Sequence, residues 1–148
     1  MTDTPRNPNL SMASRGKLIL VHPDLIRVVE RASGMLRNYR IDGKRLDFRV
    51  TCGLRTVAEQ RVLVSLGKSQ TMNSRHLLNK QTGLGHAVDI VALVDGVVTW
   101  SPFKPYYTTL AKVFKEAAEI ENVPITWGGD WKSLVDGPHF ELNRVVYP

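Results

Sequence analysis

The feature of the sequence that most constrains the fold is an apolar run over residues 87–94, interrupted only by the carboxylate of Asp89. A short apolar run between turn residues is typical of a buried strand. The pair Asp95-Gly96 follows directly and is a strong signal for a tight hairpin turn. Residues 97–100 then form the returning strand. The run therefore predicts an antiparallel sheet with a carboxylate inside one of its buried strands.

The rest of the chain mixes helical and strand-like segments instead of alternating them regularly. Apolar periodicity and one capping box predict helices over 23–38, over 56–66 and from Pro105 to about Asn122. Alternation and short apolar runs predict strands over 47–52, 124–127 and 140–142. This mixture predicts an α+β fold, a small single domain in which a central antiparallel sheet packs against helices.

Length and polarity suggest how the chain is divided. With 148 residues it fits one domain, which we expect over 17–148 after a polar leader over 1–16. No apolar run approaches the roughly 20 residues that span a bilayer, so stable membrane insertion is not expected. The N-terminal residues also lack the apolar core of a signal peptide, so we expect no export by that route. Nothing indicates oligomerisation, and we expect a monomer.

The net charge of +6 favours an anionic partner: nucleic acid, anionic lipid or an anionic cell-wall polymer. The basic residues are scattered and form no basic arm, so we do not expect nucleic-acid binding. The alternative is that the charge serves solubility alone. The single cysteine, Cys52, excludes an internal disulfide and a cysteine zinc motif. We interpret it as a small core residue, with a catalytic thiol as the alternative.

Asp89 and two histidines are candidates for a metal site. A buried carboxylate without a partner is costly, so Asp89 should be paired, hydrogen-bonded or bound to a metal, unless a strand end lets it reach solvent. His76 lies in a loop over 67–85 that is unusually long for a small domain. His139 follows Gly137-Pro138, a stiff turn. Two imidazoles and a carboxylate are the ligand set of a catalytic zinc site.

The other two histidines are not expected to share that ion. His22 precedes Pro23 at a helix start, where we interpret it as structural or capping. His86 is three residues from Asp89, and side chains on a strand alternate between its faces. The two residues therefore point to opposite sides of the sheet.

Three polar residues are candidates for acid/base and electrostatic roles. Asp136 precedes His139 by three residues, at a loop-to-strand junction where it can serve as a general base beside a metal. Asp130, in Gly128-Gly129-Asp130-Trp131, competes for this role or forms an Asx-type turn. Arg55 lies between a strand and a capped helix. Its guanidinium can bind a carboxylate or stabilise an oxyanion, and the alternative is a surface salt bridge.

Together these motifs resemble the zinc peptidases of the D-alanyl-D-alanine carboxypeptidase and dipeptidase group, and most closely the phage L-alanyl-D-glutamate endopeptidases, which are endolysins. The likeness covers about residues 20–142 and rests on five motifs in order: Gly53 to Thr56, Ser74 to His76, Gly85 to Asp89, Trp127 to Trp131, and Asp136 to His139. Several ordered motifs make the resemblance far more specific than any one of them.

The resemblance implies a small α+β fold with a zinc site at the sheet, and it gives the candidate residues roles. His76, Asp89 and His139 would bind Zn²⁺, Asp136 would be the catalytic acid/base, and Arg55 would stabilise the developing oxyanion. Ser74, Asp130 and Trp127 would support the site. The family usually has two residues between the first His and the Gly, whereas eight intervene here, residues 77–84. This segment must loop outward for His76 to keep its place, which costs little at a surface.

The expected function is zinc-dependent hydrolysis of a peptide bond in the peptidoglycan stem peptide, the L-alanyl-D-glutamate bond, which degrades the cell wall and lyses the host. The protein would wait in the host cytoplasm and reach the wall in the periplasm once another protein opens the membrane. One alternative is a D,D-carboxypeptidase or dipeptidase acting on D-Ala-D-Ala. Another is a non-catalytic, metal-stabilised module that binds the wall or nucleic acid.

Overall fold

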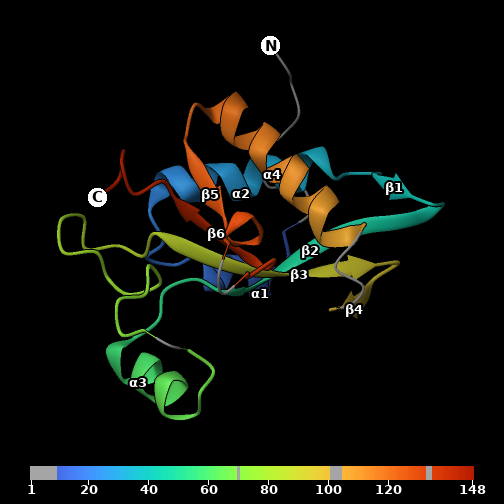
Figure 1. The fold of residues 1–148 in the computed structure, drawn as a ribbon. Helices are drawn as coiled ribbons and strands as arrows, with labels where there is room; N and C mark the ends of the chain where they lie inside the picture. Colours follow the sequence, from blue (N-terminus) through green and yellow to red (C-terminus); the bar gives the residue numbers. More distant parts are fainter. Residues whose placement is uncertain (1–9, 70, 101–104, 133–134) are drawn as a thin grey trace.

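The computed structural model describes residues 10–69, 71–100, 105–132 and 135–148. Within these residues six strands form one antiparallel sheet with the order β1-β2-β3-β6-β5, and β4 pairs with β3 beside this path (Figure 1). The strands are β1 (Arg40–Ile41), β2 (Lys44–Cys52), β3 (Ala87–Val94), β4 (Val97–Thr99), β5 (Ile125–Trp127) and β6 (His139–Leu142). The predicted α+β fold with a central antiparallel sheet is confirmed.

The helices are α1 (Met12–Lys17), α2 (Pro23–Met35), α3 (Val57–Ser65) and α4 (Tyr106–Glu121), with a 3-10 turn η1 over Gly128–Asp130. Figure 1 shows α2 and α4 together on one side of the sheet, with α3 projecting away from it on the other side. Residues 101–104, which the sequence places just before α4, lie outside the described residues.

Local chemistry explains where the helices begin and end. Pro23 opens α2, and the His22 side chain caps it by accepting a hydrogen bond from the Asp24 amide, as expected. Thr56 and Glu59 form the predicted capping box at α3. Helix α4 ends at Asn122, whose backbone adopts the left-handed conformation that asparagine tolerates. The capping signals therefore position all three of these helices.

One face of the sheet packs against helices to form the core, and the other face carries Asp89. On β3 the even-numbered residues Val88, Ile90 and Ala92 belong to the hydrophobic core shared with α2 and α4. Side chains alternate along a strand, so Asp89 points to the opposite face. Burying the apolar face against two helices fixes the register, because a slip by one residue would exchange the two faces. The core therefore determines which face carries Asp89.

Helix α1 lies within the stretch expected as a polar leader. Ser11 caps it, and Ser14, which is buried, accepts a hydrogen bond from the Val50 amide of β2. Its C-terminal end abuts Gly53, where an added Cβ would lie 1.9 Å from the carbonyl oxygen of Lys17. The boundary predicted after residue 16 thus falls inside a helix that packs on β2. Residues 1–9 of the predicted leader lie outside the described residues.

No helix within the described residues combines the length and apolarity needed to cross a membrane.

Candidate metal centre and active site

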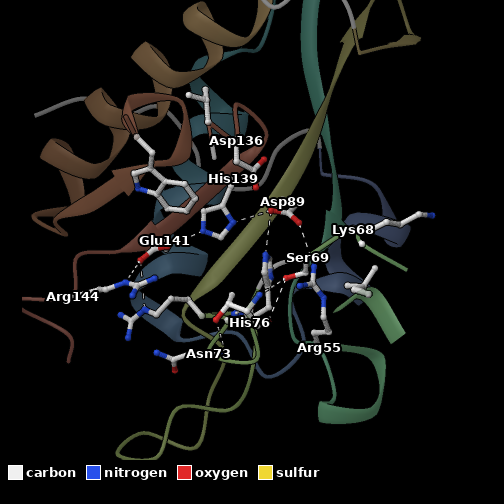
Figure 2. Close-up of a pocket in the computed structure, with 17 residues that line it drawn as sticks. Arg55, Lys68, Ser69, Asn73, His76, Asp89, Asp136, His139, Glu141 and Arg144 are labelled. Carbon is white, nitrogen blue, oxygen red and sulfur yellow. Dashed lines mark hydrogen bonds and ion pairs between the residues drawn. The ribbon is translucent and has the colours of Figure 1, made fainter. Parts of the chain in front are cut away.

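Strand pairing brings three chemically active side chains side by side. Cys52 of β2 lies opposite Asp89 of β3, and Asp89 lies opposite His139 of β6. Directly opposite residues on neighbouring strands share a face of the sheet and lie about 5 Å apart. The pairing of β2 with β3 shifts between Val50 and Cys52, which brings Cys52 into line with Asp89. The candidate site therefore lies on the face away from the core (Figure 2).

His139 is held on both sides of its imidazole ring. Its Nδ1 is 3.1 Å from Asp89 Oδ1, and its Nε2 is 2.9 Å from Glu141 Oε1. The residue is buried, with 6% of its surface exposed. An ionised carboxylate only accepts hydrogen bonds, so the Nε2 atom facing Glu141 carries the proton. In the neutral ring the lone pair is then on Nδ1, which faces Asp89.

His76 reaches the same place from the long loop before β3. Its Nδ1 is 2.7 Å from the carbonyl oxygen of Gly53, which can only accept, so Nδ1 carries the proton. Its backbone amide donates to Ser74 Oγ, and its backbone carbonyl accepts from the Arg55 amide. Its Nε2 is 3.2 Å from Asp89 Oδ1 but has no hydrogen-bond partner among the described residues. That nitrogen is buried and faces the carboxylate.

The inserted segment 77–84 turns outward, as the sequence analysis required. Leu78 forms a bridge with Gly85, and the Asn79 side chain accepts from the amides of Gln81 and Thr82. These local bonds close the insertion into a compact surface loop. His76 therefore keeps its place despite the extra residues.

The donor atoms fit a bound metal ion. His76 Nε2 and His139 Nδ1 lie 3.2 and 3.1 Å from the same atom, Asp89 Oδ1, and in neutral rings both would direct lone pairs at this acceptor. Either extra protons or a cation must stand between them. A divalent transition metal accepts this nitrogen and oxygen set and leaves room for a further ligand. Within the described residues, two groups have geometry suitable for a metal, and both contain Asp89: one with Cys52 and His76, the other with Asp136 and His139.

The pKa values report the same mutual attraction. Burial alone would raise the pKa of Asp89, but its contacts with His139 and His76 hold it well below the usual range. Burial lowers the pKa of His76, yet the contacts with Asp89 and Cys52 outweigh it and raise the value to about 10. The pKa of His139 is also raised against burial, by Asp89 and Glu141. Asp89 is thus an anion around which positive charge gathers.

Asp136 lies beside this group. It has an oxygen within 4.8 Å of donor atoms of both Asp89 and His139. Burial, and then the negative charge of Asp89, raise the pKa of its carboxyl group. The Gly128 carbonyl accepts a hydrogen bond from the Asp136 amide, and an added Cβ at Gly128 would lie 2.3 Å from the Asp136 oxygen. Close packing against Gly128 therefore fixes the backbone from which this carboxylate projects.

Arg55 approaches from the other side. One guanidinium nitrogen is 3.4 Å from Cys52 Sγ and 3.6 Å from Asp89 Oδ2, and the other donates to Gln60 Oε1 at 2.7 Å. Gln60 is fully buried and also donates to Ser69 and Thr71. It therefore links Arg55 to the loop that follows α3.

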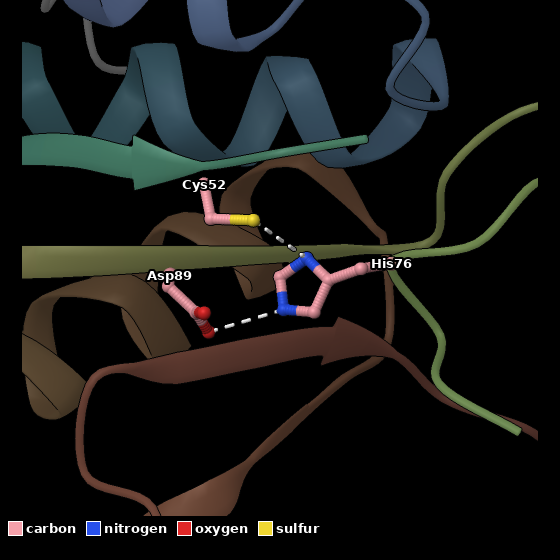
Figure 3. A group of neighbouring side chains, drawn as sticks. All are labelled: Cys52, His76 and Asp89. Atoms are coloured by element: carbon pink, nitrogen blue, oxygen red, sulfur yellow. Dashed lines mark hydrogen bonds and ion pairs between the residues drawn. The ribbon is translucent and has the colours of Figure 1, made fainter. Parts of the chain in front are cut away.

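Cys52 is only half-buried and belongs to the site, contrary to its interpretation as a small core residue. Its sulfur is 3.7 Å from His76 Nδ1 (Figure 3). Strand alternation predicted that Cys52 shares the core face of Phe48 and Val50, but the register shift after Val50 turns it to the face of Asp89.

Of the three candidate supporting residues, two hydrogen-bond to the backbone of His76 or of the turn before His139, and the third lies apart. The Ser74 hydroxyl holds the His76 amide, and Trp127 donates from its indole to the Gly137 carbonyl in the turn before His139. Asp130 is exposed and pairs with Lys115 at 2.7 Å, and it is not among the residues that line the cavity of the site. His86 is buried next to His22, outside the site, as strand alternation predicted.

Sequence reasoning missed Glu141. Only 2% of it is exposed, and besides His139 its carboxylate accepts from Arg144 Nε at 2.9 Å and lies 3.7 Å from Arg75 Nε. Contacts with His139 and Arg144 lower its pKa to about 2 although burial opposes this. The available signal was alternation: Glu141 follows His139 by two residues on a strand and must share its face.

The site opens into a cavity of about 450 Å³. Basic side chains stand on two sides of it, Lys68 near Arg55 and Arg144 near Glu141 (Figure 2). Trp131 also lines it, with its ring centroid 5.0 Å from that of His139. The volume suits a short peptide segment.

Comparison with known proteins gives concordant results. Residues 7–144 match the family model described as phage L-alanyl-D-glutamate peptidase. Over 94 residues the chain is 34% identical to the L-alanyl-D-glutamate peptidase of Listeria phage A118, which covers 64% of this chain and 30% of that relative. The chain thus spans less than a third of the relative's length.

The crystal structure of the L-Ala D-Glu endopeptidase ChiX from Serratia marcescens is also similar. The match covers 96% of this chain and 95% of ChiX, with a TM-score of 0.77 and 39% sequence identity. The family model spans nearly all of the sequence, including every residue of the candidate site. The chain therefore belongs to the family of phage L-alanyl-D-glutamate peptidases.

Proposed function

We propose that this chain is a zinc-dependent endopeptidase that hydrolyses the L-alanyl-D-glutamate bond in the stem peptide of peptidoglycan and acts as a phage endolysin. The observation that carries the proposal is the convergence of His76 Nε2, Asp89 Oδ1 and His139 Nδ1, with Asp136 beside them. The family and the names of two relatives supply the bond. His76, Asp89 and His139 are the proposed zinc ligands.

When bound there, zinc would lower the pKa of a water molecule toward neutrality and polarise the scissile carbonyl. Asp136 takes a proton from the attacking water and later gives it to the leaving amine. Its raised pKa suits this task, because it makes the carboxylate a stronger base than an ordinary aspartate. Asp136 is thus the proposed proton carrier.

Arg55 stabilises the oxygen on which negative charge develops. Its guanidinium is held by Gln60 and Cys52, so it is oriented before the substrate arrives. A preorganised donor stabilises the transition state more than a mobile one, because it need not reorganise during the reaction.

The surroundings of the site suit the same substrate. The net charge of +6 favours association with an anionic wall, and Lys68 and Arg144 bring positive charge to the cavity itself. We propose that the protein acts as a monomer on the wall of the phage host, after the host membrane has been opened.

Two measurements test the proposal. The first compares bound zinc and wall-degrading activity before chelation, after chelation and after zinc is restored. We expect activity to follow zinc, and full activity in a verified metal-free sample would exclude the mechanism.

The second identifies the cleaved bond by mass spectrometry of the digested wall. New N-terminal D-glutamate is expected. Released D-alanine would instead indicate a D,D-carboxypeptidase or dipeptidase, and absence of any cleavage by zinc-loaded protein would indicate a binding module.

A further inference from the structure

Glu141 is a buried carboxylate at the site, with 2% of its surface exposed, yet it has no place in the proposed reaction. It lies on β6 two residues after His139, so both side chains point to the same face of the sheet. A buried charge is costly unless it is paired. Glu141 is paired three times, with His139 Nε2 at 2.9 Å, Arg144 Nε at 2.9 Å and Arg75 Nε at 3.7 Å.

The contact with His139 decides which ring nitrogen is available. Glu141 accepts the proton of Nε2, so Nδ1 has the free lone pair, and Nδ1 is the atom 3.1 Å from Asp89. Turning the ring over would place a carbon atom against Glu141 and would remove Nδ1 from Asp89. One hydrogen bond therefore fixes both the tautomer and the orientation of the ring.

We propose that Glu141 is a positioning residue that holds His139 in the tautomer and orientation required to bind the metal. This inference rests on the proposed function, since it assumes a metal at His76, Asp89 and His139. A carboxylate at Nε2 also makes Nδ1 a stronger electron-pair donor to a metal than a neutral acceptor at Nε2 would. Arg144 and Arg75 offset the charge of Glu141.

His76 provides an internal contrast. The acceptor that fixes its tautomer is the backbone carbonyl of Gly53, which substitution of a side chain cannot remove. Substituting Glu141 therefore changes what orients His139 without replacing any of the three proposed ligand residues.

The test is a zinc titration against a chromogenic chelator with the full chain, comparing wild type with Glu141→Ala and Glu141→Gln. Loss of such an outer contact typically weakens metal binding about 10- to 100-fold, and we expect this for Glu141→Ala. Glutamine has nearly the same shape but can offer its oxygen to either His139 or Arg144, not both, so a smaller loss is expected. Glu119→Gln, on the exposed face of α4, is the matched control and should bind zinc like wild type.

A second readout is the Nε2–H signal of His139 in ¹⁵N-labelled, zinc-loaded protein. Wild type should retain this proton against exchange with water, and Glu141→Ala should lose it. If Glu141→Ala does not fold, Glu141→Gln decides the matter. Zinc affinity within about twofold of wild type in a folded Glu141 variant overturns the inference. A wild type that binds no zinc overturns the proposed function as well, so the two failures are distinguishable.

Discussion

The two imidazoles of the site have ring centroids only 5.2 Å apart, but different kinds of structure hold them there. His139 begins β6, which pairs with β3 on one side and β5 on the other. His76 lies in the loop between α3 and β3, where Gly53, Ser74 and Arg55 hold it by three hydrogen bonds. Asp89 lies between them and contacts both rings.

The difference divides the site into a sheet side (Asp89 and His139 on strands, with Asp136 in the turn before β6) and a loop side (His76 and Arg55 in loops, with Cys52 at the end of β2). The sheet side follows from strand register, which the whole core enforces. The loop side depends on a few local bonds, which can rearrange at lower cost. We therefore expect changes on the sheet side to affect stability and chemistry together, and changes on the loop side to affect mainly chemistry.

The largest expected effect is on the sheet side. Asp136→Asn removes the proposed proton carrier but keeps its shape, and general acid–base catalysis is typically worth about 10²- to 10⁴-fold. We expect kcat to fall by that factor while bound zinc is unchanged, as measured by steady-state kinetics and metal analysis. Asp130→Asn is the matched control, since that residue is exposed and pairs with Lys115. A fall in kcat of less than about tenfold would assign the proton transfer to another group.

The loop side is tested by Arg55→Ala. Loss of one donor to a developing oxyanion typically costs about 10²- to 10³-fold in kcat. Arg55→Lys keeps the charge but loses the planar fork that reaches Gln60 and Cys52 together, so it should restore only part of the rate. Arg61→Ala, on the exposed surface of α3, should have wild-type activity. Full activity of Arg55→Ala would contradict the proposal that Arg55 stabilises the oxyanion, and would leave His76 as the loop-side residue with a role in the reaction.

The rigidity of the sheet side is tested by Gly128→Ala. The new Cβ would lie 2.3 Å from the Asp136 carbonyl oxygen, so the backbone must shift. We expect the free energy of unfolding to fall by about 1–3 kcal/mol, together with a lower kcat. Gly16→Ala in α1 meets no atom within 4 Å and should be neutral or stabilising by up to about 1 kcal/mol. Urea unfolding measures the free energy of unfolding of both variants. If Gly128→Ala is as stable as Gly16→Ala, the backbone around Gly128 accommodates the new methyl group at little cost.

The smallest expected effect is on stability, and it concerns the hydrogen bonds that Tyr147 makes behind the loop side. Arg75, next to His76, donates to the Tyr147 carbonyl, and the Tyr147 hydroxyl donates to Asp24. That hydroxyl, followed by Arg27, lowers the pKa of Asp24 against the effect of burial. A carboxylate with a lowered pKa stabilises the fold above its unfolded value of 3.8, and this contribution is lost as pH falls through the lower folded value.

We therefore expect Tyr147→Phe to lose about 1 kcal/mol of stability at neutral pH and to be less sensitive to pH below about 4. Urea unfolding at several pH values measures this, and parallel pH profiles for the two proteins would contradict it. Activity should change little, because Gly53 and Ser74 still hold His76.

The sequence predicted the sheet side of the fold more completely than the loop side. An apolar run with one carboxylate, followed by Asp95-Gly96, sufficed to predict β3, β4 and the face of Asp89. Local signals also positioned α2, α3 and α4. Such patterns succeed because burial and capping act on neighbouring residues, which the sequence displays directly.

What escaped prediction depends on contacts between distant residues. Helix α1 has no apolar periodicity and packs through one buried hydroxyl, that of Ser14. Glu141 and Gln60 are polar residues inside a strand and a helix, and their burial depends on partners elsewhere in the chain. Neighbouring residues in the sequence do not show what covers them.

Helix α1 also bears on how far this protein can be shortened. Its end packs against Gly53, and the carbonyl of that glycine sets the tautomer of His76. A minimal version designed from the sequence would start at residue 17 and would discard the support behind Gly53. A shortened version of this protein should keep the helix, because removing it would disturb Gly53 and, through its carbonyl, the proposed metal ligand His76.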